Sequence, residues 1–289
     1  MRRTDVSYNL NKLSIMARKH ELGSPEYLNE AQQILEKLIS ILFMANEKLP
    51  NSSDNLRMAL SMMSWPIIES GHSMLVLSSM DKQRDCYILA RPIFEHVLNM
   101  GYFGAKGEET IKKSIDHYYQ KTFRDLYREI KIKDIKVAIG LKNIEAVHKD
   151  DNLRKAIDDF TTKKGFEDRS WTGDNTFKKI EIISDTYGKN IGSILTLNLF
   201  FIYRHSSEII HGTMFGVLHA RGLTQLSAQW PVNDEKLKKY SNTNISFLLM
   251  NVMLLTYCAL EIINHHFPIE DDIIKARELV KKYREEIEK

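Results

Sequence analysis

The sequence predicts an all-α protein, and three observations lead to this fold class. Apolar residues recur at the spacing of an amphipathic helix over most of the 289 residues. Glycine and proline are scarce, at 13 and 6 residues, so the chain has few of the turn formers that a many-stranded sandwich requires. We identify no stretch whose alternation of apolar and polar residues predicts a strand. We therefore expect a helical bundle.

Seven segments carry the helical pattern. In chain order they are residues 27–49, 55–80, 83–104, 109–132, 177–212, 235–267 and 270–289. Ser24 suits the N-cap of the first segment and Pro25 its first turn, whereas Pro268 ends the sixth segment. Residues 133–175 are polar and only weakly periodic, which predicts a small helical insertion on the surface. Residues 222–234 are expected to form the longest loop.

These segments divide the chain into three parts. Residues 1–52 are predicted to form an N-terminal helical extension. Residues 53–267 form the bundle, which contains the polar insertion, and residues 268–289 form a C-terminal helix. We expect one main core, because the insertion is too polar to build a second one.

Composition limits the class of protein. The 41 Lys and Arg residues exceed the 38 Asp and Glu by only three, which does not by itself mark a nucleic-acid-binding protein. Cys86 and Cys258 permit neither a disulfide framework nor a zinc site, which favours a reducing cytoplasm. Polar side chains interrupt residues 246–267, the best candidate for a membrane span, so a buried helix is the better interpretation. We expect a cytoplasmic protein without a membrane partner.

Reactive side chains concentrate in residues 203–212, hereafter the motif segment, which reads Tyr-Arg-His-Ser-Ser-Glu-Ile-Ile-His-Gly. Arg204 and His211 are seven residues apart, nearly two helical turns, so both lie on one helix face. They are separated by roughly 10 Å along the axis and lean the same way, so they do not simply converge within one chain. A two-fold dimer brings the arginine of one protomer near the histidine of the other. We therefore predict a composite site at a dimer interface.

An arginine and a histidine suit the cleavage of RNA without a metal. A base must remove the proton of the 2′-OH, and a cation must stabilise the charge of the phosphorane. Histidine titrates near neutrality, and the guanidinium is always charged and engages two phosphate oxygens. Tyr203, His205, Ser207 and Glu208 are the candidate supporting groups of the same segment.

The motif segment resembles the signature of HEPN domains, which is an arginine, a small polar residue and, a few positions later, a histidine. Arg204, His205 and His211 match it with six intervening residues. A wider pattern is similar to an uncharacterised HEPN-like bacterial family. Its Arg-x-x-x-Glu on an upstream helix matches Arg91 and Glu95, and its Tyr-Arg-x-x-Ser-x-x-x-His-Gly matches the motif segment. The resemblance covers roughly residues 60–260.

HEPN domains are helical bundles, and many are dimeric ribonucleases of toxin–antitoxin, CRISPR and abortive-infection systems. The resemblance implies a HEPN-like bundle that is a metal-independent endoribonuclease, acting as a toxin or phage-defence effector. His211 would be the general base or acid, Arg204 the phosphate clamp and Glu95 a carboxylate that orients one of them. The expected partners are RNA, a second copy of the chain and an antitoxin or other defence protein. No metal or organic cofactor is implied.

Two other interpretations of these residues stay open. In the first, His211 is a core histidine bonded to a backbone carbonyl. Arg204 then forms a buried ion pair with Glu95 or Glu208. Arg91 and Glu95, as i,i+4 neighbours, would be an intrahelical pair worth a few tenths of a kcal/mol. In the second, the same polar pocket binds a nucleotide or a partner protein without catalysis.

A third function would use a metal. Residues 145–148 and 208–211 are both Glu-x-x-His. A di-iron bundle needs two such motifs and a glutamate from each of two further helices, for which Glu95 and Glu261 are available. The first motif lies in the polar insertion, where a solvated surface is the more natural environment. This interpretation therefore ranks last.

A set of basic residues recurs near the end of the fourth predicted helix. Its members, at spacings of three, four and three, are Lys121, Arg124, Arg128 and Lys131. This spacing lines them along one helix face with Tyr118, Phe123 and Tyr127 interleaved, which suits an RNA backbone with stacked bases. The alternative is a solvated face balanced by Asp125 and Glu129.

Overall fold

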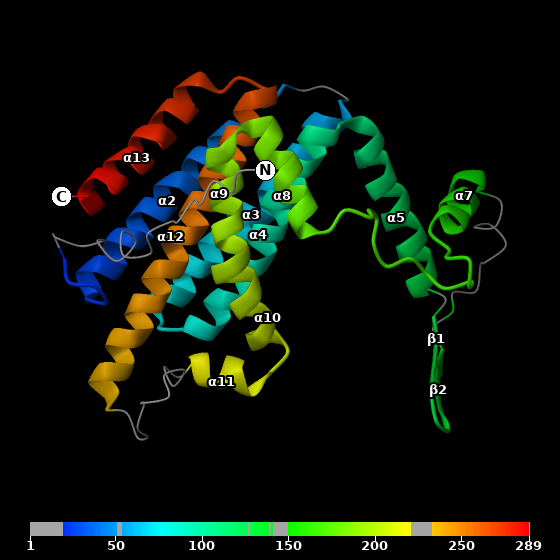
Figure 1. The fold of residues 1–289 in the computed structure, drawn as a ribbon, viewed down its shortest axis with the longest axis horizontal. Helices are drawn as coiled ribbons and strands as arrows, with labels where there is room; N and C mark the ends of the chain where they lie inside the picture. Colours follow the sequence, from blue (N-terminus) through cyan, green and yellow to red (C-terminus); the bar gives the residue numbers. More distant parts are fainter. Residues whose placement is uncertain are drawn as a thin grey trace, which may run out of the picture.

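The fold is an all-α bundle, as the sequence predicts (Figure 1). The computed structural model describes residues 20–50, 54–126, 128–138, 140, 150–220 and 233–288, with side chains through residue 281. The helices are α2 (Pro25–Glu47), α3 (Asn55–Ser79), α4 (Gln83–Lys106), α5 (Glu108–Leu126), α7 (Asp151–Asp159), α8 (Thr176–Tyr187), α9 (Lys189–Asn198), the π-helix η1 (Leu199–Arg204), α10 (His205–Ile210), α11 (Met214–Ala220), α12 (Asp234–His266) and α13 (Glu270–Glu288). The strands are β1 (Glu129–Ile132) and β2 (Ile135–Ala138).

Helix α12 is the centre of the bundle. It packs against α2 and α4, and α3 packs along α4 (Figure 1). By length and composition α12 could cross a membrane, but 78% of its most apolar stretch is buried inside the described bundle. Leu35 and Leu38 of α2 and Phe94 of α4 are among the largest fully buried side chains. The prediction that residues 246–267 form a buried helix is therefore confirmed.

The start of α2 follows from its sequence. The Ser24 hydroxyl accepts a hydrogen bond from the Tyr27 amide at 3.2 Å, which satisfies one of the free donors of the first turn. Pro25 occupies the first turn, where its missing N–H is not needed. The predicted cap and start of this helix are confirmed.

The predicted helix over residues 109–132 is wrong at its end. Helix α5 stops at Leu126, and β1 and β2 form an antiparallel hairpin. Ile130 pairs with Val137 and Ile132 with Ile135, so four β-branched residues share one face of the hairpin. The period-two alternation of Ile and Lys is thus a strand signal that the spacing of the basic residues masked.

The polar insertion is a lobe built on α5. Helix α7 lies beside the second half of α5, and the hairpin projects beyond the end of α5, away from the bundle (Figure 1). Phe160, at the end of α7, is buried and its ring centroid lies 4.9 Å from that of His117 on α5. Residues 133–175 therefore contain the expected helix, but also a strand. Trp171, which follows α7 in the chain, packs on Phe103 of α4 at 5.1 Å between ring centroids.

The predicted helical stretch 177–212 is divided by two local features. Gly188 ends α8 with a φ of 95°, a conformation that favours glycine. Further on, the buried Asn198 amide donates to the Ile194 carbonyl at 2.8 Å, the oxygen that an α-helical N–H of residue 198 would use. The π-helix η1 begins at the next residue. The predicted motif at 145–148 and most of the predicted loop 222–234 lie outside the described residues.

Candidate functional site

The π-helix η1 carries the first two residues of the motif segment. It ends at Arg204, and α10 follows without a break because both Arg204 and His205 keep right-handed helical backbone angles. Single π turns inside α-helices are common at functional sites. Gly212, with a φ of 63°, ends α10 in the left-handed conformation that favours glycine. The motif segment is therefore one short helix that begins in a π-helical turn and ends at a left-handed glycine.

Arg204 and His211 are both exposed to solvent. The Arg204 guanidinium lies 5.6 Å from the centroid of the Phe200 ring, and it makes no ion pair with any residue that the structure describes. His211 is the C-cap of α10, and its backbone N–H donates to the Ser207 carbonyl at 3.0 Å. A buried ion pair for Arg204 and a core position for His211 are therefore wrong. Both side chains are available to a ligand or a partner.

The two predicted motifs meet at Tyr203. The Arg91 guanidinium carbon lies 4.4 Å from the centroid of the Tyr203 ring, and Arg91 Nε donates to Glu95 Oε1 at 3.0 Å. This ion pair is half-exposed, so solvent reduces its value to a few tenths of a kcal/mol. Glu95 contacts Arg91 and reaches neither Arg204 nor His211 among the described contacts of one chain. An orienting role for Glu95 would therefore have to act across an interface.

The other supporting residues fix the ends of α10. The Thr213 hydroxyl donates to the Glu208 carboxylate at 2.7 Å, directly after the helix ends. Ser206, which the predicted site did not include, is fully buried and donates to the Tyr87 carbonyl of α4 at 2.7 Å. Ser207 is half-buried on the adjacent face. These bonds hold the motif segment to the bundle.

Sequence reasoning missed an aromatic cluster around His205. The His205 and His219 rings stack with centroids 4.7 Å apart and planes 19° apart, and Phe215 stacks on His219 at 5.8 Å. Tyr87 Oη lies 3.2 Å from His219 Nε2. Phe215 and His219 are i,i+4 neighbours on α11, and this helical spacing is the sequence signal that places their two rings on one helix face.

Burial favours the neutral form of both histidines of this cluster. Burial lowers the pKa of His219 to about 4, with a further contribution from repulsion by His205. Burial also lowers the pKa of His205, and the Arg204 charge adds to this, although a bond to the Phe201 carbonyl opposes it. Because a carbonyl only accepts, His205 Nδ1 carries the proton of that 3.0 Å bond. Its Nε2 is then the basic nitrogen, which suits proton transfer.

Helix α11 lies unusually close to α10. A Cβ placed on Gly216 would stand 2.5 Å from the Glu208 carbonyl oxygen, so only glycine fits at this position. The Thr213 hydroxyl also accepts a hydrogen bond from the Gly216 amide at 3.1 Å. The close approach of these two helices fixes His219 against His205.

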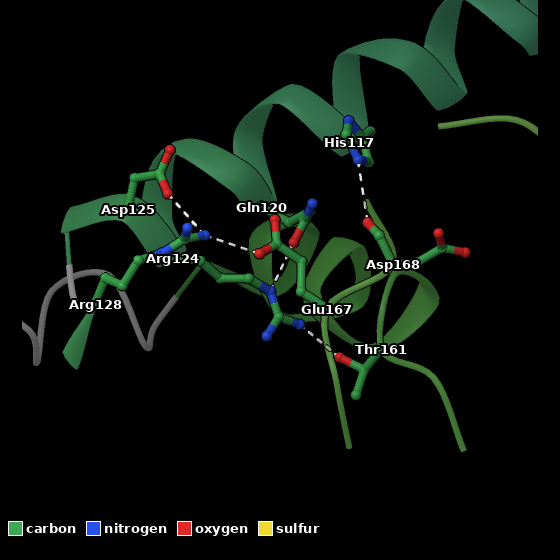
Figure 2. Close-up of polar contacts among 8 residues, drawn as sticks. All are labelled: His117, Gln120, Arg124, Asp125, Arg128, Thr161, Glu167 and Asp168. Atoms are coloured by element: carbon green, nitrogen blue, oxygen red, sulfur yellow. Dashed lines mark hydrogen bonds and ion pairs between the residues drawn. The ribbon is translucent and has the colours of Figure 1, made fainter. Parts of the chain in front are cut away.

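The predicted basic stripe does not lie on one helix face. Lys121 and Arg124 are on α5, Arg128 follows the end of that helix, and Lys131 is on β1. Arg124 turns toward the α7 segment and Arg128 toward Glu167 and Asp125 (Figure 2). The stripe prediction is therefore wrong in geometry. The lobe that carries these residues stands apart from α10 and α11 (Figure 1).

The di-iron interpretation does not fit the described part of the chain. Glu261 accepts two hydrogen bonds from Arg277, at 2.8 and 2.7 Å, and Glu95 is paired with Arg91. No group of three or more His, Cys, Asp or Glu side chains in the described residues is arranged to hold a metal ion. The two glutamates required by that scheme are thus engaged elsewhere.

Comparison with known proteins places the chain in a family. The model of a family of unknown function, DUF5677, matches residues 59–222, more than half of the chain. The chain belongs to DUF5677. The part that matches DUF5677 runs from α3 through α11 and contains both predicted motifs, the insertion lobe and His219. No curated protein and no solved structure matches the chain.

Proposed function

We propose that this DUF5677 protein is a metal-independent endoribonuclease of the HEPN type that acts as a toxin or phage-defence effector. Its site would combine Arg204 of one protomer with His211 of its partner. The observation that carries the proposal is the exposure of both side chains at the two ends of one short helix, with no described ion pair to occupy Arg204. A charged group and a proton-transfer group are therefore accessible to a ligand, and neither has to be buried in the core.

The surface beside these residues supports a dimer. Residues 200–217 expose five large apolar side chains, which are Phe200, Ile210, Met214, Phe215 and Val217. Apolar side chains gathered in one exposed stretch are typical of protein–protein interfaces. In a two-fold dimer the same patch occurs on both protomers. An interface here would bring Arg204 of one protomer and His211 of the other into one cleft.

The chemistry follows from the two groups. His211 removes the proton of the 2′-OH, and the resulting oxygen attacks the adjacent phosphorus. Arg204 holds two non-bridging oxygens and stabilises the charge that develops on the phosphorane. The 5′-oxygen leaves and takes a proton from an acid. The products are a 2′,3′-cyclic phosphate and a 5′-hydroxyl. His205 Nε2, next to Arg204 in the chain, is the second candidate for proton transfer.

The proposal is tested by cleavage of a labelled RNA with purified protein. We expect cleavage that persists in EDTA, with products that end in a 2′,3′-cyclic phosphate. Arg204→Ala and His211→Ala should each abolish cleavage while the far-UV circular dichroism and the oligomeric mass stay unchanged. His72→Ala, at an exposed histidine of α3, is the matched control and should cut RNA normally. Cleavage that requires a metal, or that survives both substitutions, contradicts the proposal.

The biological role has its own test. Expression of the wild-type chain should slow bacterial growth, and His211→Ala should relieve this effect at equal protein level. If the purified protein cuts no RNA and both variants behave like the wild type in cells, the protein is instead a binding module. In that case the same surface would bind a nucleotide or a protein partner.

A further inference from the structure

A second polar site lies in the insertion lobe, outside the motif segment. A pocket of about 630 Å³ opens between the end of α5, β1 and the turn that follows α7. Arg124, Arg128 and Arg169 line it, together with the ring of Phe166 and the carboxylates of Glu129 and Glu167. Its volume lies within the range of small-ligand sites. Three arginines in one pocket indicate an anionic ligand.

Arg124 is held as a fixed cation by neutral groups. Its Nε donates to Gln120 Oε1 at 2.7 Å, and its Nη2 donates to the Thr161 hydroxyl at 2.6 Å (Figure 2). The same Nη2 also donates to the Ile157 carbonyl at 3.2 Å. None of these acceptors carries a charge, and no described carboxylate pairs with this arginine. Its Nη1 remains without a described partner. The guanidinium is thus fixed in place, and its Nη1 is the nitrogen that remains to donate to a phosphate oxygen.

Each acidic side chain of the pocket is paired with a cation, although Arg128 pairs with two of them. Glu167 pairs with Arg128 at 2.9 Å, and Glu129 pairs with Lys136 at 2.8 Å. Asp125 also pairs with Arg128, as Figure 2 shows. Arg124 and Arg169 make no described ion pair, so the cations at the pocket exceed its carboxylates by one, with Arg124, Arg128, Arg169 and Lys136 against Asp125, Glu129 and Glu167. Residues 118–138 and 160–170, the two segments around the pocket, together contain nine Lys or Arg and five Asp or Glu, so they carry a net positive charge.

Phe166 offers an exposed ring beside these cations. Its side chain is 69% exposed, although the turn that carries it is firmly built. The Phe166 amide and carbonyl both bond to Thr162, at 3.1 and 2.8 Å, and Thr161 bridges to Glu167. Gly165 supplies the φ of 78° that the turn requires. A phenylalanine held rigidly in solvent next to arginines is the arrangement that stacks an unpaired base.

We propose that this pocket binds single-stranded RNA, with a phosphate on Arg124 and Arg169 and a base stacked on Phe166. The choice of RNA rests on the proposed function, whereas the preference for a single strand rests on the exposed ring alone. Duplex bases are stacked on each other and leave no face for Phe166. The lobe thus recognises RNA at a distance from the motif segment, so binding and cleavage are separable.

The test measures binding without cleavage. Fluorescence anisotropy with a labelled 12-nucleotide RNA is carried out in the His211→Ala background. We expect Phe166→Ala to weaken binding about tenfold, in line with the loss of one stacked base. Phe177→Ala, at an equally exposed phenylalanine of α8, is the matched control and should leave binding unchanged. The same RNA as a duplex should bind more weakly, and Phe166→Ala should not affect it.

The phosphate contact has a separate readout. Arg169→Ala should weaken binding and reduce the slope of log K against log salt by about 0.7, the value for one phosphate contact to a single strand. Arg154→Ala, at an exposed arginine of α7 paired with Asp151, should change neither quantity. The proposal is overturned if Phe166→Ala and Arg169→Ala bind like the parent, or if duplex binds as tightly as single strand. Normal binding by a protein that cuts no RNA contradicts the proposed function and leaves this inference standing.

Discussion

Acidification should loosen α11 from the bundle, and His219 is the group responsible. The pKa of a free histidine is 6.5, and burial against Tyr87 and His205 lowers that of His219 to about 4. Above pH 6.5 the imidazole is neutral whether α11 is docked or not, so the contribution of His219 to stability does not change with pH there. Between pH 6.5 and 4 only the undocked state binds the proton. The contribution of His219 to stability is therefore lost progressively as the pH falls through this window.

The magnitude follows from the shift. At 1.36 kcal/mol per pKa unit, the change from 6.5 to about 4 corresponds to at most about 3.4 kcal/mol. Because His219 is only half-buried, solvent screening makes the actual contribution smaller than this upper bound. Amide hydrogen exchange of α11 at pH 7.5 and pH 4.5 measures the effect locally, after correction for the intrinsic exchange rate.

A substitution isolates this histidine from the other titrating groups. His219→Phe keeps a flat ring against His205 and Phe215 but cannot bind a proton. We expect protection of α11 in this variant to depend much less on pH than in the wild type. His72→Phe, at an exposed position on α3, is the control and should retain the wild-type pH dependence. An unchanged pH dependence in His219→Phe, or greater protection of α11 in the wild type at pH 4.5 than at pH 7.5, would show that His219 does not control this docking.

Two further substitutions test how the motif segment is held. Ser206→Ala removes the buried bond to the Tyr87 carbonyl and should lower the free energy of unfolding by about 1 kcal/mol in urea titrations. Ser207→Ala should lower the free energy of unfolding by less than half of that amount. Equal losses in the two variants would contradict the special role of the Ser206 hydrogen bond. Gly216→Ala places a methyl group 2.5 Å from the Glu208 carbonyl, which cannot shift without moving α10. We expect a loss of about 2–3 kcal/mol and of RNA cleavage, and wild-type melting of this variant would show that the close approach is unimportant.

The long apolar helices could be predicted from sequence because their signal is local. Residues 246–267 carry enough apolar surface that only a core position suits them, and the structure buries them in α12. The hairpin was missed because Lys131 fits both a basic helical stripe and the polar face of a strand. Lys131 lies opposite Lys136 in the hairpin, and such pairing depends on a second strand that the helical periodicity of one segment does not reveal.

Only the local part of the candidate site could be predicted from sequence. The motif segment is contiguous, so its residues could be named, but the contacts that surround it come from far along the chain. His219 meets Tyr87 across 132 positions, and Arg91 meets Tyr203 from a different helix. No local pattern encodes such pairs. The π turn at η1 likewise depends on how the buried Asn198 competes for a carbonyl.

A composite Arg204–His211 site, shared between two protomers, can be tested by mixing two variants that are each inactive. Arg204→Ala and His211→Ala are unfolded together, refolded and assayed for RNA cleavage against each variant treated alone. Random pairing makes about half of the dimers mixed, and each mixed dimer regains one intact site of two. We expect the refolded mixture to recover about a quarter of wild-type activity. If the mixture stays as inactive as its components while the wild type recovers under the same treatment, the site is not shared between protomers.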